Sequence, residues 1–322
     1  MTAKSNLRGV ALALLSFGLY ATHDVFVKIL GGQYTPFQLV FFSVLFGFPL
    51  VTVMLLRDQT ADTLQPHHPW WSAARTVAAL VTGVTAFYAF SVLPLAQTYA
   101  ILFAAPLIVT VLSIPILGEK VGVHRWGAVV VGLIGVLVVL RPGGASLGLG
   151  HLAALIAAFS GAFGSIIVRK IGGEERSAVL ILYPMVANFF AMGALMPVAY
   201  DPMPVEHLGM VALMALLGFL ATLCIIEAYR MADAAIIAPM QYSQILWATA
   251  YGVAIFDETP QSATIAGAAL VIASGVYIVL RESLGGKSRN RPVLRTRTRT
   301  ETGIMPRASV FPFRRSEAPR EP

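Results

Sequence analysis

The sequence predicts an all-α membrane protein with ten transmembrane helices, arranged as two inverted repeats of five helices each. Three observations support this prediction. Hydrophobic residues make up 57 % of the 322 residues and charged residues only 12 %, about half the charged share of a typical soluble domain. Ten apolar stretches are each about 20 residues long, which is enough to cross a bilayer. Segments of the first half also match segments of the second half at a nearly constant offset.

The candidate spans are joined by connections too short for a soluble domain. They cover residues 9–29, 35–56, 71–92, 95–116, 122–140, 150–170, 177–198, 207–229, 234–256 and 262–281. The first span is too long for the apolar region of a signal peptide and lacks a small-residue cleavage site, so we expect it to be retained. The single cysteine, Cys224, excludes an intrachain disulfide and argues against a cysteine-based metal site.

The internal repeat is visible at two places. Residues 9–32 match residues 150–173 at an offset of 141, and residues 127–141 match residues 267–281 at an offset of 140. An odd number of helices per repeat forces the second copy to insert upside down. We therefore expect a first repeat over 9–141 and a second over 150–281. Inverted repeats place a substrate path where they meet, near the membrane midplane, so this pattern favours a transporter.

Charge is distributed unevenly along the chain. Residues 282–322 hold ten Lys/Arg and four Glu, a net charge of +6, whereas residues 1–281 hold thirteen Lys/Arg and twelve Asp/Glu, a net charge of +1. The basic excess is thus a tail, which we expect to be disordered and drawn to anionic lipid rather than to nucleic acid. The Lys/Arg asymmetry of the loops predicts that both termini lie in the cytoplasm.

A polar segment within the ninth span, residues 234–252, is the main candidate for a substrate site. On a regular helix Met240, Gln244, Trp247 and Tyr251 share one face. Their amide and aromatic groups could simply hold neighbouring helices together, or form a wall that stacks on and hydrogen-bonds a planar solute. The fourth span aligns with this segment at an offset of 139, and both contain proline, as interrupted helices of transporter sites do. The candidate substrate-binding residues are Gln97, Tyr99, Asn188, Gln241, Tyr242, Gln244 and Trp247.

Charged residues within or beside the spans give further candidates. Asp24 and Lys28 lie one helical turn apart and could pair. They are either an interfacial ion pair or residues that couple or gate transport. Glu119 and Glu258 end the fourth helix of each repeat, where charge at the water interface is the simplest interpretation and a gate is the alternative. Arg75 is expected to snorkel to water, although it could instead stack on Trp71 four residues earlier or bind an anionic group of a solute.

The acidic turns LGEK (117–120) and FDET (256–259), together with the two five-helix halves, resemble the EamA family of the drug/metabolite transporter superfamily over residues 9–281. Within that family the chain is most similar to bacterial riboflavin importers. The segments that carry this likeness are residues 21–32, 36–50, 68–79, 92–127 and 238–248. The resemblance implies alternating access to a central cavity lined by helices 1, 3, 4, 6, 8 and 9.

The predicted function is therefore riboflavin uptake by a secondary transporter of the bacterial inner membrane, with export of amino acids or other small metabolites as the alternative. An enzyme is not expected, because the sequence contains no nucleophile elbow, HExxH motif, P-loop or dinucleotide-binding fingerprint. No cofactor or metal is expected. The partners are the small-molecule solute and membrane lipids, and a homodimer is left open.

Overall fold

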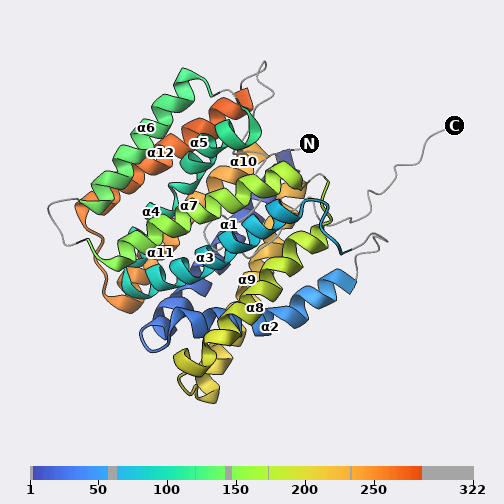
Figure 1. Ribbon diagram of the computed structural model, residues 1–322. Coiled ribbons are helices and arrows are strands. Elements are labelled where there is room, and N and C mark those ends of the chain that lie inside the picture. The colour runs from blue at the N-terminus through green and yellow to red at the C-terminus, as the bar shows by residue number, and fades with distance from the viewer. Residues whose placement is uncertain are drawn as a thin grey trace.

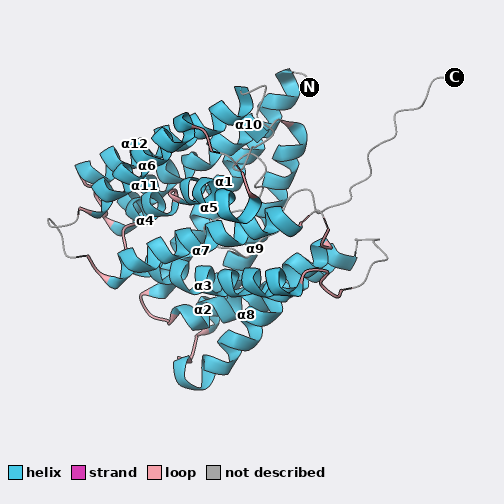
Figure 2. Ribbon diagram, turned by 45° about the horizontal axis from the view of Figure 1, so that its top comes forward, coloured by secondary structure: helices cyan, strands magenta, loops and turns pink. Residues whose placement is uncertain are grey.

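The computed structural model describes residues 3–56, 64–119, 121–141, 147–172, 174–232 and 234–284. All regular elements in these ranges are helical, and they form one bundle of elongated helices (Figures 1 and 2). Most of the predicted basic tail, from residue 285 onward, lies outside the described residues.

The predicted spans agree closely with the helices. Eight spans are single helices: α1 (Ala3–Gly31), α2 (Pro36–Leu56), α3 (Pro69–Val92), α6 (Val123–Leu140), α7 (Leu149–Ile171), α8 (Ser177–Ala199), α9 (Val205–Met231) and α12 (Ser262–Leu284). The fourth span is divided into α4 (Leu95–Leu102) and α5 (Ala105–Leu117). Counting this divided span as one, nine segments of the described chain are long and apolar enough to cross a membrane.

The tenth predicted span, over residues 234–256, is the most interrupted. It consists of α10 (Ala234–Ile237), the 3₁₀ turn η1 (Ala238–Tyr242) and α11 (Ser243–Phe256). Pro239 lies in η1 and Pro106 follows the break between α4 and α5. Proline has no N–H and its ring clashes with the preceding turn, which accounts for both breaks. The expectation that Met240 lies on a regular helical face with Gln244 was wrong, because a 3₁₀ turn has three residues per turn.

Three helix pairs form the longest packing interfaces: α1 with α9, α3 with α7, and α6 with α12. Figure 1 shows α6 and α12 running side by side along one edge of the bundle. There the backbones approach closely at glycine, since a Cβ added to Gly267 would lie 2.5 Å from the carbonyl oxygen of Gly135. Small residues permit such close contact between membrane helices.

Candidate functional site

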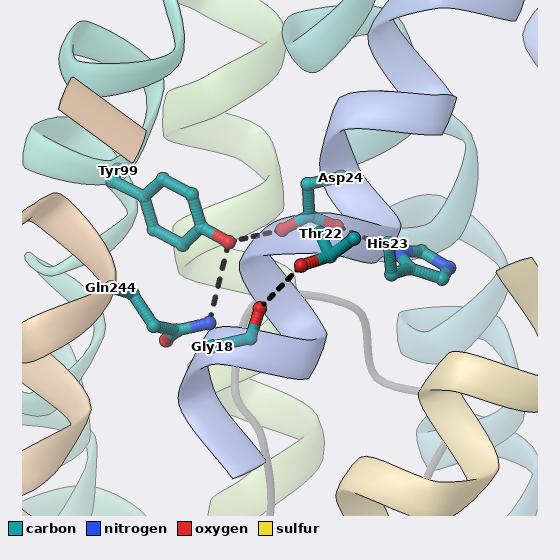
Figure 3. Close-up of polar contacts among 6 residues, drawn as sticks. All are labelled: Gly18, Thr22, His23, Asp24, Tyr99 and Gln244. Atoms are coloured by element: carbon teal, nitrogen blue, oxygen red, sulfur yellow. Dashed lines mark hydrogen bonds and ion pairs between the residues drawn. The ribbon is translucent and has the colours of Figure 1, made fainter. Parts of the chain in front are cut away.

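Three buried polar side chains from three helices meet within the bundle (Figure 3). Asp24 comes from α1, Tyr99 from α4 and Gln244 from α11, and each is at most 1 % exposed. The Tyr99 hydroxyl donates a hydrogen bond to Asp24 Oδ2. Nε2 of Gln244 donates in turn to the Tyr99 hydroxyl over 3.3 Å. We call Asp24, Tyr99 and Gln244 the polar cluster. It joins helices from both predicted repeats, two of them next to a helix break.

The second oxygen of the Asp24 carboxylate faces a histidine. Nδ1 of His23 lies 2.7 Å from Asp24 Oδ1, and the His23 ring packs edge-on against Phe87 at a centroid distance of 6.1 Å. A buried charge is costly unless it is hydrogen-bonded, and here both carboxylate oxygens have a partner. A carboxylate and an imidazole in contact can exchange or share a proton, and together they can also bind a cationic group.

Gln244 retains hydrogen-bonding capacity inside the bundle. Its Oε1 has no hydrogen-bond partner among the described residues, although the atom is buried. Buried acceptors are normally satisfied, so such an atom marks a place where a solute or water can donate a bond. The amide therefore offers one acceptor to a solute while its Nε2 holds Tyr99.

The helices of the polar cluster also carry aromatic rings, on α11 and at the end of α4. Trp247, one turn beyond Gln244 on α11, stacks on Tyr251 at a centroid distance of 6.3 Å and an interplanar angle of 27°. The Tyr251 hydroxyl and Thr22 Oγ1 are 2.9 Å apart, which ties this pair to α1 two residues before Asp24. Trp247 is 41 % exposed, so its indole has surface available for a further contact.

At the end of α4, Phe103 lies between Tyr99 and Tyr242, with ring centroids 5.7 Å and 5.1 Å away, respectively. The Tyr242 side chain is buried, and its hydroxyl lies beside Gly275 of α12. Tyr242 packs against Phe103 and lies beside α12, and Phe103 in turn packs against Tyr99 of the polar cluster.

The remaining candidate residues lie elsewhere. Gln97 donates from Nε2 to Nε2 of His151 on α7, at 3.0 Å. Asn188 of α8 is buried and donates to the carbonyl of Pro184 in its own helix, while its Oδ1 has no partner among the described residues. Gln241 is half-buried in η1. The structure thus brings Asp24, Tyr99 and Gln244 together. Gln97, Asn188 and Gln241 form no described hydrogen bond with this cluster.

Lys28 does not form the pair with Asp24 that the helical spacing allowed. Its Nζ lies 2.7 Å from Glu258 Oε1 and donates to the carbonyl of Leu93 over 2.6 Å. The reason is geometric: Lys28 lies near the end of α1, level with the end of α3, while the Asp24 carboxylate is held by Tyr99. The partners that the sequence reasoning missed are His23 and Glu258. The sequence feature that could have indicated Glu258 is its charge, which is opposite to that of Lys28 and also lies at the end of a helix.

Arg75 of α3 also departs from expectation. The side chain is 4 % exposed, and its Nη1 has no hydrogen-bond partner among the described residues. Snorkelling to water is therefore not what the structure shows. The cation above the Trp71 ring is Lys170, with its Nζ 4.5 Å from the ring centroid.

Comparison with known proteins gives a consistent result. The model of the EamA-like transporter family matches residues 7–141 and again residues 148–281. An S-adenosylmethionine uptake transporter of Rickettsia prowazekii is 27 % identical, covering 89 % of this chain and 97 % of its own length. A riboflavin transporter of Rhizobium johnstonii is also 27 % identical, covering 75 % of this chain and 78 % of its own.

An exporter and a solved structure are also similar to this chain. The pseudopaline exporter CntI of Pseudomonas aeruginosa is 23 % identical, covering 84 % of this chain and 95 % of its own. One crystal structure with 18 % sequence identity matches the fold with a TM-score of 0.56, over 87 % of this chain and 98 % of that one. The relatives thus include both uptake and export proteins with different solutes.

Proposed function

Because the chain belongs to the EamA-like transporter family, we propose that it is a secondary transporter that imports a small solute with a flat heteroaromatic ring, riboflavin being the first candidate. The observation that carries this proposal is the polar cluster, a buried carboxylate, phenol and amide held between α1, α4 and α11. Polar groups buried within a bundle at broken helices are typical of transporter binding sites.

Riboflavin suits the mixture of groups around the cluster. Its ring system is planar, with apolar faces and polar edges, so it can stack on an aromatic side chain while its edges form hydrogen bonds. Trp247 offers the exposed aromatic surface and Gln244 offers the unpartnered acceptor. The riboflavin transporter of Rhizobium johnstonii supports this candidate by its similarity.

S-adenosylmethionine is the second candidate, and the Asp24 carboxylate favours it. That solute combines a flat heteroaromatic ring with a sulfonium and an ammonium cation, whereas riboflavin is uncharged. A buried carboxylate stabilises a cation strongly because the surrounding dielectric is low. The same carboxylate can instead carry a proton, so Asp24 is our candidate for coupling riboflavin uptake to a proton gradient.

Uptake measurements separate these candidates. Labelled riboflavin and labelled S-adenosylmethionine are offered to bacteria that lack their own uptake systems and express this chain, each with the other solute as unlabelled competitor. We expect saturable uptake of one solute, and we expect Asp24→Asn to abolish it at normal membrane abundance. Efflux of preloaded solute without uptake would favour the exporter. Transport of neither solute in either direction would refute the proposed substrates.

A further inference from the structure

We infer that two ion pairs at opposite ends of the bundle, Lys28–Glu258 and Arg169–Glu119, are the two gates of the transport cycle. The inference assigns residues within the proposed transport function and rests on it. Lys28 Nζ lies 2.7 Å from Glu258 Oε1. Arg169 forms an ion pair with Glu119 through its Nη2. In both pairs the side chains are largely buried, at 18 % exposure or less, so the pairs are weakly screened by water.

The two pairs are equivalent under the internal repeat. Lys28 and Arg169 are separated by 141 residues, and Glu119 and Glu258 by 139 residues, which are the offsets of the helices that carry them. Each pair joins a cation on the first helix of one repeat to the glutamate that follows the fourth helix of the other repeat. Interface charge alone gives no reason for partners to be exchanged between repeats in this matched way.

The pairs lie at opposite ends of α3, which fixes their relative position. Near the start of α3, Lys170 lies over the ring of Trp71, so its neighbour Arg169 is at that end. Just past the end of α3, Lys28 donates to the carbonyl of Leu93. A helix of 24 residues is about 36 Å long, which is comparable to the thickness of a bilayer. The two ion pairs are therefore on opposite faces of the membrane.

Each pair also holds a helix end that must move if the site is to open. Besides Lys28, Glu258 binds the backbone N–H of Leu95 at the start of α4, at 2.9 Å. It thus ties the end of α11 to α1 and α4, the three helices of the polar cluster. Asp24 is one turn inward from Lys28, roughly 6 Å along the axis. Breaking this pair would let the ends of α1, α4 and α11 separate, and the polar cluster would become accessible from the face at which Lys28 lies.

At the other face, α7 is tied to the end of α5. Arg169 binds Glu119, and Lys170 Nζ donates to the carbonyl of Ile116 over 2.8 Å. The buried face of α7 next to this pair includes Ala162, which packs against Ala105 and Val109 of α5. Separation of α7 from α5 would expose this face. Both pairs are formed in the structure, which corresponds to a state closed at both ends; alternating access requires that they open in turn.

Cysteine accessibility tests the inference without any substrate. In a Cys224→Ala background, a reporter cysteine replaces Ala21 on α1 or Ala162 on α7. These buried alanines are equivalent in the repeat and lie one turn beyond Asp24 and its counterpart. Modification by a membrane-impermeant maleimide is measured in intact cells and in inside-out vesicles. The gates are opened separately with Glu258→Gln and Glu119→Gln.

We expect Glu258→Gln to speed modification of the Ala21 reporter about tenfold from one face only, and Glu119→Gln to do the same for the Ala162 reporter from the other face. Tenfold corresponds to about 1.4 kcal/mol. The reversed pair, Lys28→Glu with Glu258→Lys, should restore slow modification. Glu227→Gln is the matched control, because the 3.0 Å Glu227–Arg230 pair lies within one helix and closes nothing.

Unchanged rates in both gate variants, or equal acceleration from both faces, would overturn the inference in favour of ion pairs that only stabilise the fold. A separate measurement of membrane abundance detects variants that fail to fold, and for these the gate is opened from the cationic side instead, with Lys28→Gln or Arg169→Gln. The accessibility result stands whatever the uptake assay shows. If neither proposed solute is transported, the accessibility result still tests the gates. If the gate variants leave the modification rates unchanged, the uptake assay still tests the proposed substrates.

Discussion

The first helix of each half, α1 and α7, can be compared residue by residue. Lys28 on α1 and Arg169 on α7 are equivalent, and each forms an ion pair with a glutamate of the other half. One turn inward the two helices differ: Asp24 on α1 belongs to the polar cluster, whereas the equivalent residue on α7 is Ser165. The charges at the helix ends are thus shared by both halves, and the buried carboxylate is not.

This difference suggests a division of roles. Two gates that open in turn perform the same task on opposite faces, so a duplicated sequence can keep them alike. A binding site contacts a solute without symmetry, so its residues gain nothing from being repeated. Tyr99 follows the same pattern, because its counterpart at an offset of 139 is Ala238. Substitutions at these positions test whether transport depends on the residues in which the halves differ.

Asp24→Ser, which gives α1 the residue of α7, should have the largest effect. It removes the carboxylate that accepts from Tyr99 and contacts His23. Each hydrogen bond to a charged group contributes about 1.5–3 kcal/mol, so we expect the kcat/KM of uptake to fall at least about 100-fold. Uptake is measured per amount of protein in the membrane. Ser165→Ala is the control at the equivalent position and should retain nearly full uptake; equal loss in both would end the proposed asymmetry.

Gly267→Ala tests whether the two halves also differ in helix packing, at the equivalent glycines of α12 and α6. A Cβ at Gly267 would meet the Gly135 backbone at 2.5 Å, whereas a Cβ at the equivalent Gly127 would meet nothing within 4 Å. Overpacking typically costs about 1–3 kcal/mol. We expect Gly267→Ala to lower thermal stability in detergent and Gly127→Ala to leave it unchanged. Equal stability of the two variants would show that α6 and α12 can separate without loss.

Tyr99→Phe should have a smaller effect than Asp24→Ser, since it removes the Tyr99 bond to the carboxylate but keeps the ring and the His23 contact. The loss of one bond to a charged group predicts a decrease of about tenfold in kcat/KM. Initial rates over a range of solute concentrations provide the value. A decrease in kcat/KM as large as that of Asp24→Ser would mean that the carboxylate is held in its working position by Tyr99 alone. An unchanged kcat/KM would mean that the solute does not bind near this hydroxyl.

How much of this could be predicted from sequence depends on the range of the interaction. Helix positions followed from apolar length, as the helices of the structure confirm. The 3₁₀ turn at Pro239 shifted the helical phase, so the face assumed for Met240 was wrong. Lys28 was paired with its neighbour in sequence, although its partner is 230 residues away. Spacing predicts contacts within a helix; contacts between helices depend on packing that it does not contain.

Trp247→Ala should have the smallest effect on uptake, and it tests whether an aromatic side chain found in only one half contacts the solute. Trp247 stands where the first half has Ile108, so the exposed indole belongs to one half only. If it stacks on the solute, the lost contact of about 0.5–1.5 kcal/mol raises KM by roughly three- to tenfold. Trp247→Phe retains a ring and should raise KM less, and Ile108→Ala should leave KM unchanged. An unchanged KM for Trp247→Ala, with reduced abundance in the membrane, would instead assign the indole to packing against Tyr251 and α1.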